Sequence, residues 1–403
     1  MSNETRPEIR FPEFTDEWEQ VKLKDVATVF DGTHQTPKYT ESGVKFVSVE
    51  NIKTLETEKY ISQEAYDSEY SKKQAEKGDV LMTRIGDIGT AKVIETDEPL
   101  AYYVTLALLK PNEIDSSFLA WLISSPEVQR NIWKRTLHIA FPKKINLGEI
   151  NQIEMNVPSL EEQTKIGTFF KQIDNTITLH QRKLDLLKET KKGFLQKMFP
   201  KNGAKVPEIR FSGFTEDWEQ RRLSDVASIV GGGTPSTSNP EYWDGDIDWY
   251  APAEIGDQIY VSKSLKTITE LGQQKSSAKI LPIGTVLFTS RAGIGNTAIL
   301  AKEGTTNQGF QSIVPHKNKL DSYFIFSRTH ELKRYGEVTG AGSTFAEVSG
   351  KQMAKMPILI PCINEQRKIG AFFEQLDTTI TLHQRELDVL KETKKGFLQK
   401  MFV

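Results

Sequence analysis

The sequence predicts a mixed α/β protein with two globular bodies separated by two long antiparallel coiled-coil helices, and with an internal pseudo-twofold repeat. Three observations predict this fold. A 38-residue segment occurs twice, apolar residues recur in it at heptad spacing, and a shorter segment near the start of each half also occurs twice. Chains built from repeated supersecondary units show this kind of self-similarity.

The two long helices are predicted at residues 162–199 and 365–402, which align at an offset of 203 with 31 of 38 positions identical. Apolar residues alternate at spacings of four and three, which is typical of a coiled-coil seam. The seam positions are Ile166, Phe170, Ile173, Ile177, His180, Leu184, Leu187, Lys191, Phe194 and Met198, repeated as Ile369, Phe373, Leu376, Ile380, His383, Leu387, Leu390, Lys394, Phe397 and Met401. We expect the seams to pair antiparallel, each helix about 57 Å long.

Residues around these segments predict where the first helix starts and stops. Ser159 followed by Glu162 forms a capping-box pattern, and Pro200 with Gly203 predicts the end. His180 and His383 lie near the middle of the two seams, where a polar residue that sets the register is favoured over a metal ligand.

The repeat also includes an N-terminal block, because Pro7–Val29 recurs as Pro207–Ile229 with 14 of 23 positions identical. The predicted domains are therefore residues 1–158, a central long helix at 159–200, a second body at 201–361 and a C-terminal long helix at 362–403. The bodies share only a weak strand–turn–strand pattern, Gly78–Gly89 and Gly284–Gly295, at an offset of 206. The repeated N-terminal blocks and long helices form a nearly identical frame in each half, which suggests that they contact each other or two copies of one partner. The divergent bodies suggest two different targets. The alternative interpretation is that the repeat reflects only a recent duplication.

Composition bounds the class of protein. The 403 residues carry a net charge of -2, so a nucleic-acid role would need locally clustered charge. The single cysteine, Cys362, excludes an internal disulfide and a cysteine-based zinc site. Without a long apolar run or an apolar signal segment at the start, we expect a cytoplasmic chain with no membrane partner.

Motifs for catalysis are missing from the sequence. Residues 239–242, Asn-Pro-Glu-Tyr, resemble the Asn-Pro-Pro-Tyr loop of adenine methyltransferases, but Glu241 replaces the second proline and a simple turn is favoured. The sequence has no GxxxxGK[ST] phosphate loop, and its six histidines lack metal-ligand spacing. We therefore expect a non-enzymatic chain with no catalytic residue, no bound cofactor and no metal.

Polar, glycine-bearing loops in both bodies are candidates for contact with DNA, because hydroxyl, amide and cationic groups bind phosphates and base edges. In the first body the predicted DNA-binding residues are Thr33, His34, Lys38, Arg84, His138, Lys143 and Lys144. In the second body they are Thr234, Ser236, Arg291, Asn296, Gln308, Gln311, Ser343 and Thr344. An arginine in a tight glycine turn, such as Arg291, is suited to a two-point contact with guanine.

These features together resemble a known family. Each body is followed by Pro-x-x-x-Glu-Gln, at Pro158–Gln163 and Pro361–Gln366, and then by a long helix. The Gly-Thr-Pro loop at Gly233–Pro235, the turn at Gly293–Gly295 and the pair Asn307-Gln308 are similar to motifs of its target-recognition domains. The chain is similar over nearly its whole length to the specificity subunit of type I restriction-modification enzymes.

The resemblance implies a non-catalytic subunit with two target-recognition domains. Each domain would read one half of a bipartite double-stranded DNA target, and the paired helices would set the separation of the half-sites. Two modification subunits that use S-adenosylmethionine would dock on the frame, and motor-nuclease restriction subunits that use ATP and Mg²⁺ would join them. The alternative is a non-catalytic coiled-coil scaffold with two protein-binding heads.

Overall fold

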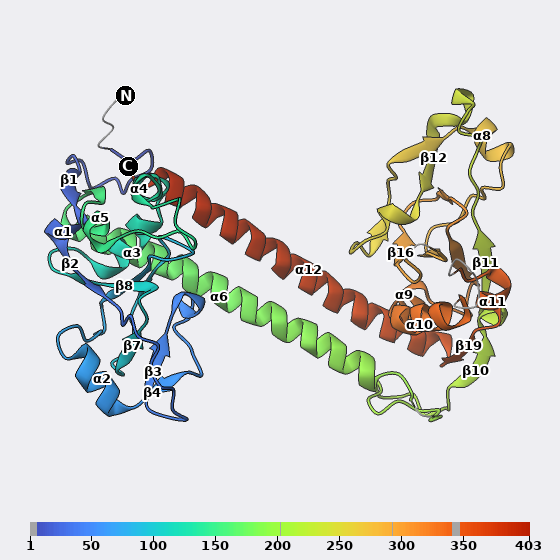
Figure 1. Ribbon diagram of the computed structural model, residues 1–403. Coiled ribbons are helices and arrows are strands. Elements are labelled where there is room, and N and C mark those ends of the chain that lie inside the picture. The colour runs from blue at the N-terminus through green and yellow to red at the C-terminus, as the bar shows by residue number, and fades with distance from the viewer. Residues whose placement is uncertain (1–5, 202, 292, 341–346) are drawn as a thin grey trace. The chain divides into compact units, whose positions relative to one another are not determined.

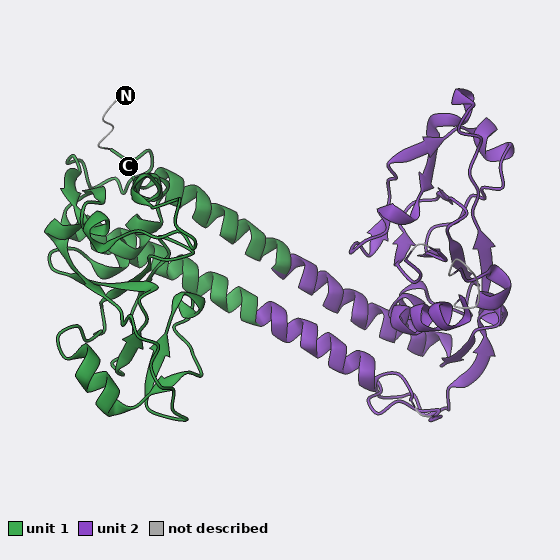
Figure 2. Cartoon of the chain, viewed as in Figure 1, with its two compact units in different colours: residues 1–182, 384–403 green, residues 183–383 purple. Residues whose placement is uncertain are grey.

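The computed structural model describes residues 6–201, 203–291, 293–340 and 347–403, and the chain forms two compact units. Unit 1 consists of residues 1–182 and 384–403, and unit 2 of residues 183–383 (Figure 2). Each unit therefore contains one body together with one half of each long helix. The predicted domains, in contrast, are consecutive segments of the chain, with each long helix as a domain of its own. Those boundaries stay a prediction.

The body of unit 1 is mixed α/β, as predicted (Figure 1). Its strands are β1 (Glu19–Lys22), β2 (Ala27–Asp31), β3 (Val44–Val47), β4 (Tyr60–Ile61), β5 (Val80–Thr83), β6 (Ala91–Val93), β7 (Leu100–Tyr102), β8 (Leu106–Pro111) and β9 (Glu154–Val157). Its α-helices are α1 (Leu23–Val26), α2 (Gln63–Tyr70), α3 (Ser116–Ser124), α4 (Pro126–Arg135) and α5 (Leu147–Asn151). The strands form an antiparallel sheet β2-β8-β5-β6, a sheet β4-β3-β7 and the antiparallel pair β1–β9.

The central strand β5 is buried on both faces, because alternate side chains enter different cores. Val80 and Met82 belong to a core with α3 and α4, whereas Leu81 belongs to a core beneath the three-stranded sheet. The helical pattern over 116–135 is divided into α3 and α4, since Ser125 caps the second helix and Pro126 occupies its first turn.

Unit 2 repeats this plan with more strands. They are β10 (Glu219–Arg222), β11 (Ala227–Gly231), β12 (Trp243–Tyr250), β13 (Tyr260–Val261), β14 (Lys266–Ile268), β15 (Val286–Phe288), β16 (Thr297–Leu300), β17 (Thr305–Thr306), β18 (Gln311–Pro315) and β19 (Pro357–Ile360). The helices of this body are α7 (Leu223–Val226), α8 (Glu270–Gln274), α9 (Ser322–Phe326), α10 (Thr329–Gly340) and α11 (Gly350–Ala354). The strand orders are β11-β18-β15-β16-β13, β14-β12-β17 and β10-β19.

The first long helix, α6 (Leu160–Lys197), starts as the sequence predicted. The N–H of Glu162 donates to Ser159 Oγ at 3.4 Å. The Glu162 carboxylate accepts two bonds from Arg10, at 2.8 and 2.7 Å, which ties the N-terminal block to the helix start. The second long helix, α12 (Ile363–Lys400), starts with the equivalent pair Arg210–Glu365 at 2.7 and 2.8 Å.

The glutamine that follows each of these glutamates links the helix to the body. Gln163 Oε1 accepts from the N–H of Asp115 at 2.9 Å, and its Nε2 donates to the carbonyl of Pro158 at 2.8 Å. Gln366 does the same with Asp321 and Pro361, at 3.1 and 2.9 Å. The Pro-x-x-x-Glu-Gln sequence is therefore a structural joint between body and helix.

Within unit 1, the C-terminal end of α12 completes the core of the body (Figure 1). The Phe402 ring lies 5.7 Å from Phe170, 5.8 Å from Phe118 and 6.3 Å from Trp18, measured between ring centroids. In unit 2, Phe199 makes the equivalent contacts, at 5.9 Å from Phe373, 5.7 Å from Phe324 and 6.0 Å from Trp218. Both tryptophans are therefore core residues.

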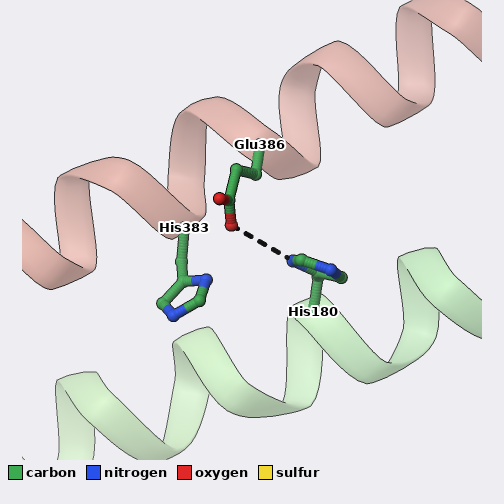
Figure 3. A group of neighbouring side chains, drawn as sticks. All are labelled: His180, His383 and Glu386. Atoms are coloured by element: carbon green, nitrogen blue, oxygen red, sulfur yellow. Dashed lines mark ion pairs between the residues drawn. The ribbon is translucent and has the colours of Figure 1, made fainter.

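The predicted seam positions of both helices are all buried or half-buried. In unit 1 the His180 imidazole of α6 points toward the Glu386 carboxylate of α12, with Nδ1 3.6 Å from Oε2 (Figure 3). His180 therefore makes a polar contact in an otherwise largely apolar seam. Among the residues that the structure describes, no helix is both long and apolar enough to cross a membrane.

Candidate nucleic-acid interface

The first candidate loop of unit 1 follows β2 and is held close to the sheet by a glycine. A Cβ on Gly32 would lie 2.3 Å from the Tyr103 carbonyl oxygen, which leaves room for glycine alone. The N–H of the buried Thr33 donates to the carbonyl of Tyr102 at 3.2 Å, whereas His34 and Lys38 are exposed. Of the three predicted residues in this loop, two can therefore meet a ligand from solvent.

The Tyr102 carbonyl, which accepts the hydrogen bond from Thr33, also accepts a second hydrogen bond. The Tyr70 hydroxyl donates to the Tyr102 carbonyl at 2.7 Å. Burial raises the pKa of Tyr70 above its ordinary value, so its hydroxyl stays protonated and remains a donor at neutral pH. The loop is thus attached to a rigid part of the sheet.

Asp31, the last residue of β2, joins two of the predicted site residues. Its carboxylate pairs with the guanidinium of Arg84 and lies 2.7 Å from His34 Nε2. Arg84 is only 7% exposed, and its Nε also donates to the Ile145 carbonyl at 3.3 Å. Arg84 is therefore placed to position the loop, and no motif in the sequence indicates this role of Asp31.

The basic loop of unit 1, residues 136–146, connects α4 to α5 and is anchored at its base. Lys144 forms a bridge to Leu137 and another to Ile85, and the N–H of Gly86 donates to the Lys143 carbonyl at 2.8 Å. The predicted residues His138, Lys143 and Lys144 are all exposed on this loop. The structure therefore brings three of the predicted residues together on one projecting loop.

The basic loop also carries apolar side chains that the site prediction missed. Ile139 is 99% and Phe141 104% exposed, and Trp133 on the last turn of α4 is 57% exposed. The signal available in the sequence was the pattern Ile-Ala-Phe-Pro next to two lysines, in a segment without acidic residues.

In unit 2, the loop after β11 is close-packed in the same way. Cβ atoms on Gly232 and Gly233 would lie 2.1 Å from the Asn307 carbonyl oxygen and 2.2 Å from Ser277 Oγ. The exposed Thr234 hydroxyl donates to the Gln308 side chain, so two predicted residues distant in sequence meet. Ser236, also exposed, lies at the same surface with its Oγ 2.8 Å from that of Ser238.

The glycine turn of unit 2 carries Arg291 and Asn296. Arg291 is half-buried and forms a backbone bridge to Glu347, and its guanidinium has no ion pair with any residue that the structure describes. Asn296 is exposed, and its Nδ2 donates to the Ile255 carbonyl at 3.3 Å. Gln311 is half-buried at the end of β18 that pairs with Gly231, and Ser343 and Thr344 lie outside the described residues.

The two turn arginines occupy different structural positions. The N–H of Ile145 donates to the Arg84 carbonyl at 2.9 Å, and the N–H of Val348 donates to the Ser290 carbonyl at 3.0 Å. Arg84 thus corresponds to Ser290, as the offset of 206 predicts, and the counterpart of Arg291 is Ile85. The two bodies therefore present different chemistry from one shared turn.

Comparison with known proteins places this geometry in a family. The sequence model for the type I restriction modification DNA specificity domain matches twice, at residues 15–189 and 215–392. A stretch of 191 residues is 34% identical to the type I restriction enzyme MjaIX specificity subunit of Methanocaldococcus jannaschii, and covers 47% of this chain and 44% of that protein.

Two further comparisons extend over nearly the whole chain. The putative type I restriction enzyme MjaX specificity subunit of M. jannaschii is 26% identical over 405 residues, with 96% of this chain and 93% of that protein covered. The crystal structure of the S subunit of a type I restriction-modification system from M. genitalium has the same fold, with a TM-score of 0.66, 13% identity and 99% of each chain covered. Since the family model matches most of the sequence, the chain belongs to the type I restriction-modification DNA specificity family.

Proposed function

We propose that this chain is the non-catalytic subunit that gives a type I restriction-modification complex its DNA sequence specificity. Each body acts as a target-recognition domain and reads one half of a bipartite duplex target. The observation that carries the proposal is the double family match, at residues 15–189 and 215–392, on two bodies with equivalent joints and different loops. The two bodies stand on nearly identical frames but carry different loops. This arrangement is expected of a protein that binds two DNA half-sites of different sequence.

The predicted loop residues are proposed as the reading surface. In unit 1 the exposed cations Lys38, Lys143 and Lys144 contact phosphates, while His34 is fixed by Asp31 for a base edge or phosphate. In unit 2 the surface is mainly uncharged, with Thr234, Gln308 and Asn296 as donors and acceptors toward base edges. Arg291 is proposed to contact guanine or an adjacent phosphate.

The helical frame is proposed to be a pseudo-twofold pair of antiparallel coiled-coil helices. In unit 1, Phe169 contacts Phe397 with ring centroids 5.0 Å apart, and Asp174 pairs with Lys394 at 2.6 Å. The residue number rises along one helix as it falls along the other, which supports antiparallel pairing. In unit 2, Phe194 contacts Phe372 at the same 5.0 Å.

This frame is proposed to dock two modification subunits, which use S-adenosylmethionine, with motor-nuclease restriction subunits that use ATP and Mg²⁺ joining the complex in the cytoplasm. A hollow of about 750 Å³ in unit 1 supports docking near the N-terminal block. It is lined by Phe11, Phe169, Lys165 and the half-exposed Leu160, which give it apolar walls with a charged rim.

The DNA methylation pattern produced by the assembled complex tests the proposal. We expect sequencing of the methylated DNA to give one motif of two half-sites. Replacing residues 30–150 by the first body of another family member should change one half-site and leave the other intact. Methylation without a sequence motif, or a motif unchanged by the exchange, would contradict the proposal.

Arg291 provides a test of the reading surface in unit 2. Arg291→Ala should weaken binding by about 1–3 kcal/mol and relax one base position in one half-site. Lys263→Ala, which removes another exposed cation of the same unit, serves as the matched control and should leave the motif unchanged. An Arg291→Ala complex with wild-type affinity and motif would remove Arg291 from the surface.

A further inference from the structure

The basic loop of unit 1 combines fully exposed apolar side chains at its tip with exposed lysines beside them. Ile139 and Phe141 are 99% and 104% exposed, although burial of such apolar side chains is favourable. They leave unfilled a hollow of about 310 Å³ beside the loop, which is lined by Trp133, Lys143 and the Gly86 turn. The two side chains therefore project from the body instead of packing on it.

The loop is held in shape, so the projection is a fixed feature. His138 Nε2 donates to the Trp133 carbonyl at 2.9 Å, and the two rings lie 4.1 Å apart between centroids. From the other side of the loop, Lys143 Nζ lies 4.7 Å above the Trp133 ring. With Leu137 bridged to Lys144 at the base, both arms of the loop are fixed. A pre-organised loop loses little conformational entropy on binding.

The charge around the tip indicates what it binds. From Val128 to Gly148 the sequence contains Arg130, Lys134, Arg135, Lys143 and Lys144 and no acidic residue, although the whole chain has a net charge of -2. Arg130 and Arg135 pair with glutamates outside this segment, whereas Lys134, Lys143 and Lys144 are exposed. Cores of protein–protein interfaces are depleted in lysine, whereas phosphate backbones attract it, so nucleic acid is the favoured occupant.

We propose that Phe141 and Ile139 form a wedge that inserts between adjacent base pairs of the half-site read by unit 1. Apolar side chains used in this way partly unstack a base step and kink the duplex. Lys143 and Lys144 hold the flanking phosphates, which offsets the cost of unstacking. The wedge adds shape and deformability to the readout, because flexible pyrimidine–purine steps are unstacked most easily. This proposal rests on the proposed function.

The test uses the complete complex with its modification subunits. The duplex carries the sequence motif that methylation sequencing has identified. 2-Aminopurine is placed in turn at each base step of the two half-sites. Its fluorescence should rise at one step of the unit 1 half-site when the wild-type complex binds. Phe141→Ala with Ile139→Ala should abolish that rise and weaken binding about 5- to 150-fold, the range that alanine replacement of a base-stacking side chain produces.

Two matched variants separate the wedge from a general effect of apolar area. Phe141→Leu keeps an apolar tip and should retain most of the rise. Ile283→Ala removes a 65% exposed isoleucine from unit 2, outside the long helices and the predicted loops, and should change neither fluorescence nor affinity.

Four outcomes overturn the wedge. A wild-type complex that binds its motif with no local fluorescence rise leaves the proposed function intact and removes the wedge. A double variant with unchanged fluorescence and affinity also removes the wedge and leaves the proposed function intact. A double variant whose mass shows loss of modification subunits would make the loop a protein contact. Failure of the wild-type complex to prefer its motif over random DNA would overturn the proposed function and the wedge together.

Discussion

Arg10 and Glu162 form a two-point ion pair, with Nε and one terminal nitrogen of the guanidinium at 2.8 and 2.7 Å from the two carboxylate oxygens. Glu162 is 1% exposed, so the carboxylate has lost nearly all its hydration. The hydrogen bonds that Arg10 donates to Glu162 keep the pKa of Arg10 above its ordinary value. Removing one member would leave the other charge buried and unpaired, which typically costs 3–5 kcal/mol.

Arg10→Ala should therefore destabilise unit 1 by about 3–5 kcal/mol and leave unit 2 unaffected. Hydrogen exchange followed by mass spectrometry checks this, with faster exchange expected in β1, β9 and the start of α6. Arg210→Ala is the matched variant and should accelerate exchange only in unit 2, where Arg210 pairs with Glu365. Equal acceleration in both units from either variant would disprove a local role for the joint.

The lysines in the helix seams pair with aspartates. Lys394 Nζ lies 2.6 Å from Asp174 Oδ1 and 4.3 Å above the Trp121 ring in unit 1, and Lys191 lies 2.5 Å from Asp377 in unit 2. Polar groups at seam positions select one register, because any shift separates them. We expect Lys394→Asp to lower the thermal midpoint, since it places two carboxylates together.

Adding Asp174→Lys to Lys394→Asp should restore part of that loss by reversing the pair. Because Lys394 and Asp174 are 22% and 40% exposed, the coupling energy of the pair should be modest, about 0.2–1 kcal/mol. A double-mutant cycle on thermal midpoints measures it. A double variant no more stable than the worse single variant would show that the pair does not fix the register.

Much of this frame follows from the sequence alone. The cap at Ser159 and the end of α6 before Pro200 depend on local signals, and the structure agrees with them. The predicted seam positions are buried or half-buried, and the coiled coil stays a prediction. The equivalence of Arg84 and Ser290 likewise follows from a simple offset.

Long-range contacts could not be predicted in this way. The pairing of β1 with β9 joins residues 19–22 to 154–157, and Phe402 enters a core formed mainly by the first body. The chain order suggests instead that each helix belongs with the body before it. The Asp31–Arg84 pair and the projecting Phe141 depend on loop geometry, which side-chain spacing does not encode.

Asp248 on β12 should make the stability of unit 2 depend on acid pH. Burial is the largest influence and pushes its pKa upward, but bonds from Lys302 Nζ at 2.7 Å and from the N–H of Ser264 at 2.9 Å outweigh it. The net pKa lies below the ordinary 3.8. As the pH falls the unfolded carboxyl takes up its proton first, so the stabilisation is present above about pH 3.8 and is lost below it.

Asp248→Asn should therefore destabilise unit 2 at neutral pH, and its deficit against the wild type should shrink as the pH falls toward 3. Urea unfolding at pH 7, 5 and 3.5 measures this difference. Asp257→Asn, at an exposed aspartate of the same unit, is the matched control and should show no such trend. A deficit that stays constant across this pH range would rule out the assigned charge state.

The length of the helices should set the spacing between half-sites. Both helices run without a break for 38 residues, and their seam midpoints lie near residues 182 and 385. Four residues inserted after Arg182 and four after Gln384 lengthen each helix by about 6 Å and keep the seam nearly in phase. At about 3.4 Å per base pair, methylation sequencing should then find the same half-site bases with a spacer one or two base pairs longer.

Two-residue insertions at the same places turn each helix by about 200° and should abolish methylation, because the apolar seam of each helix would then face away from the other helix. Altered half-site bases with an unchanged spacer in the four-residue variant would show that the helices do not set the distance.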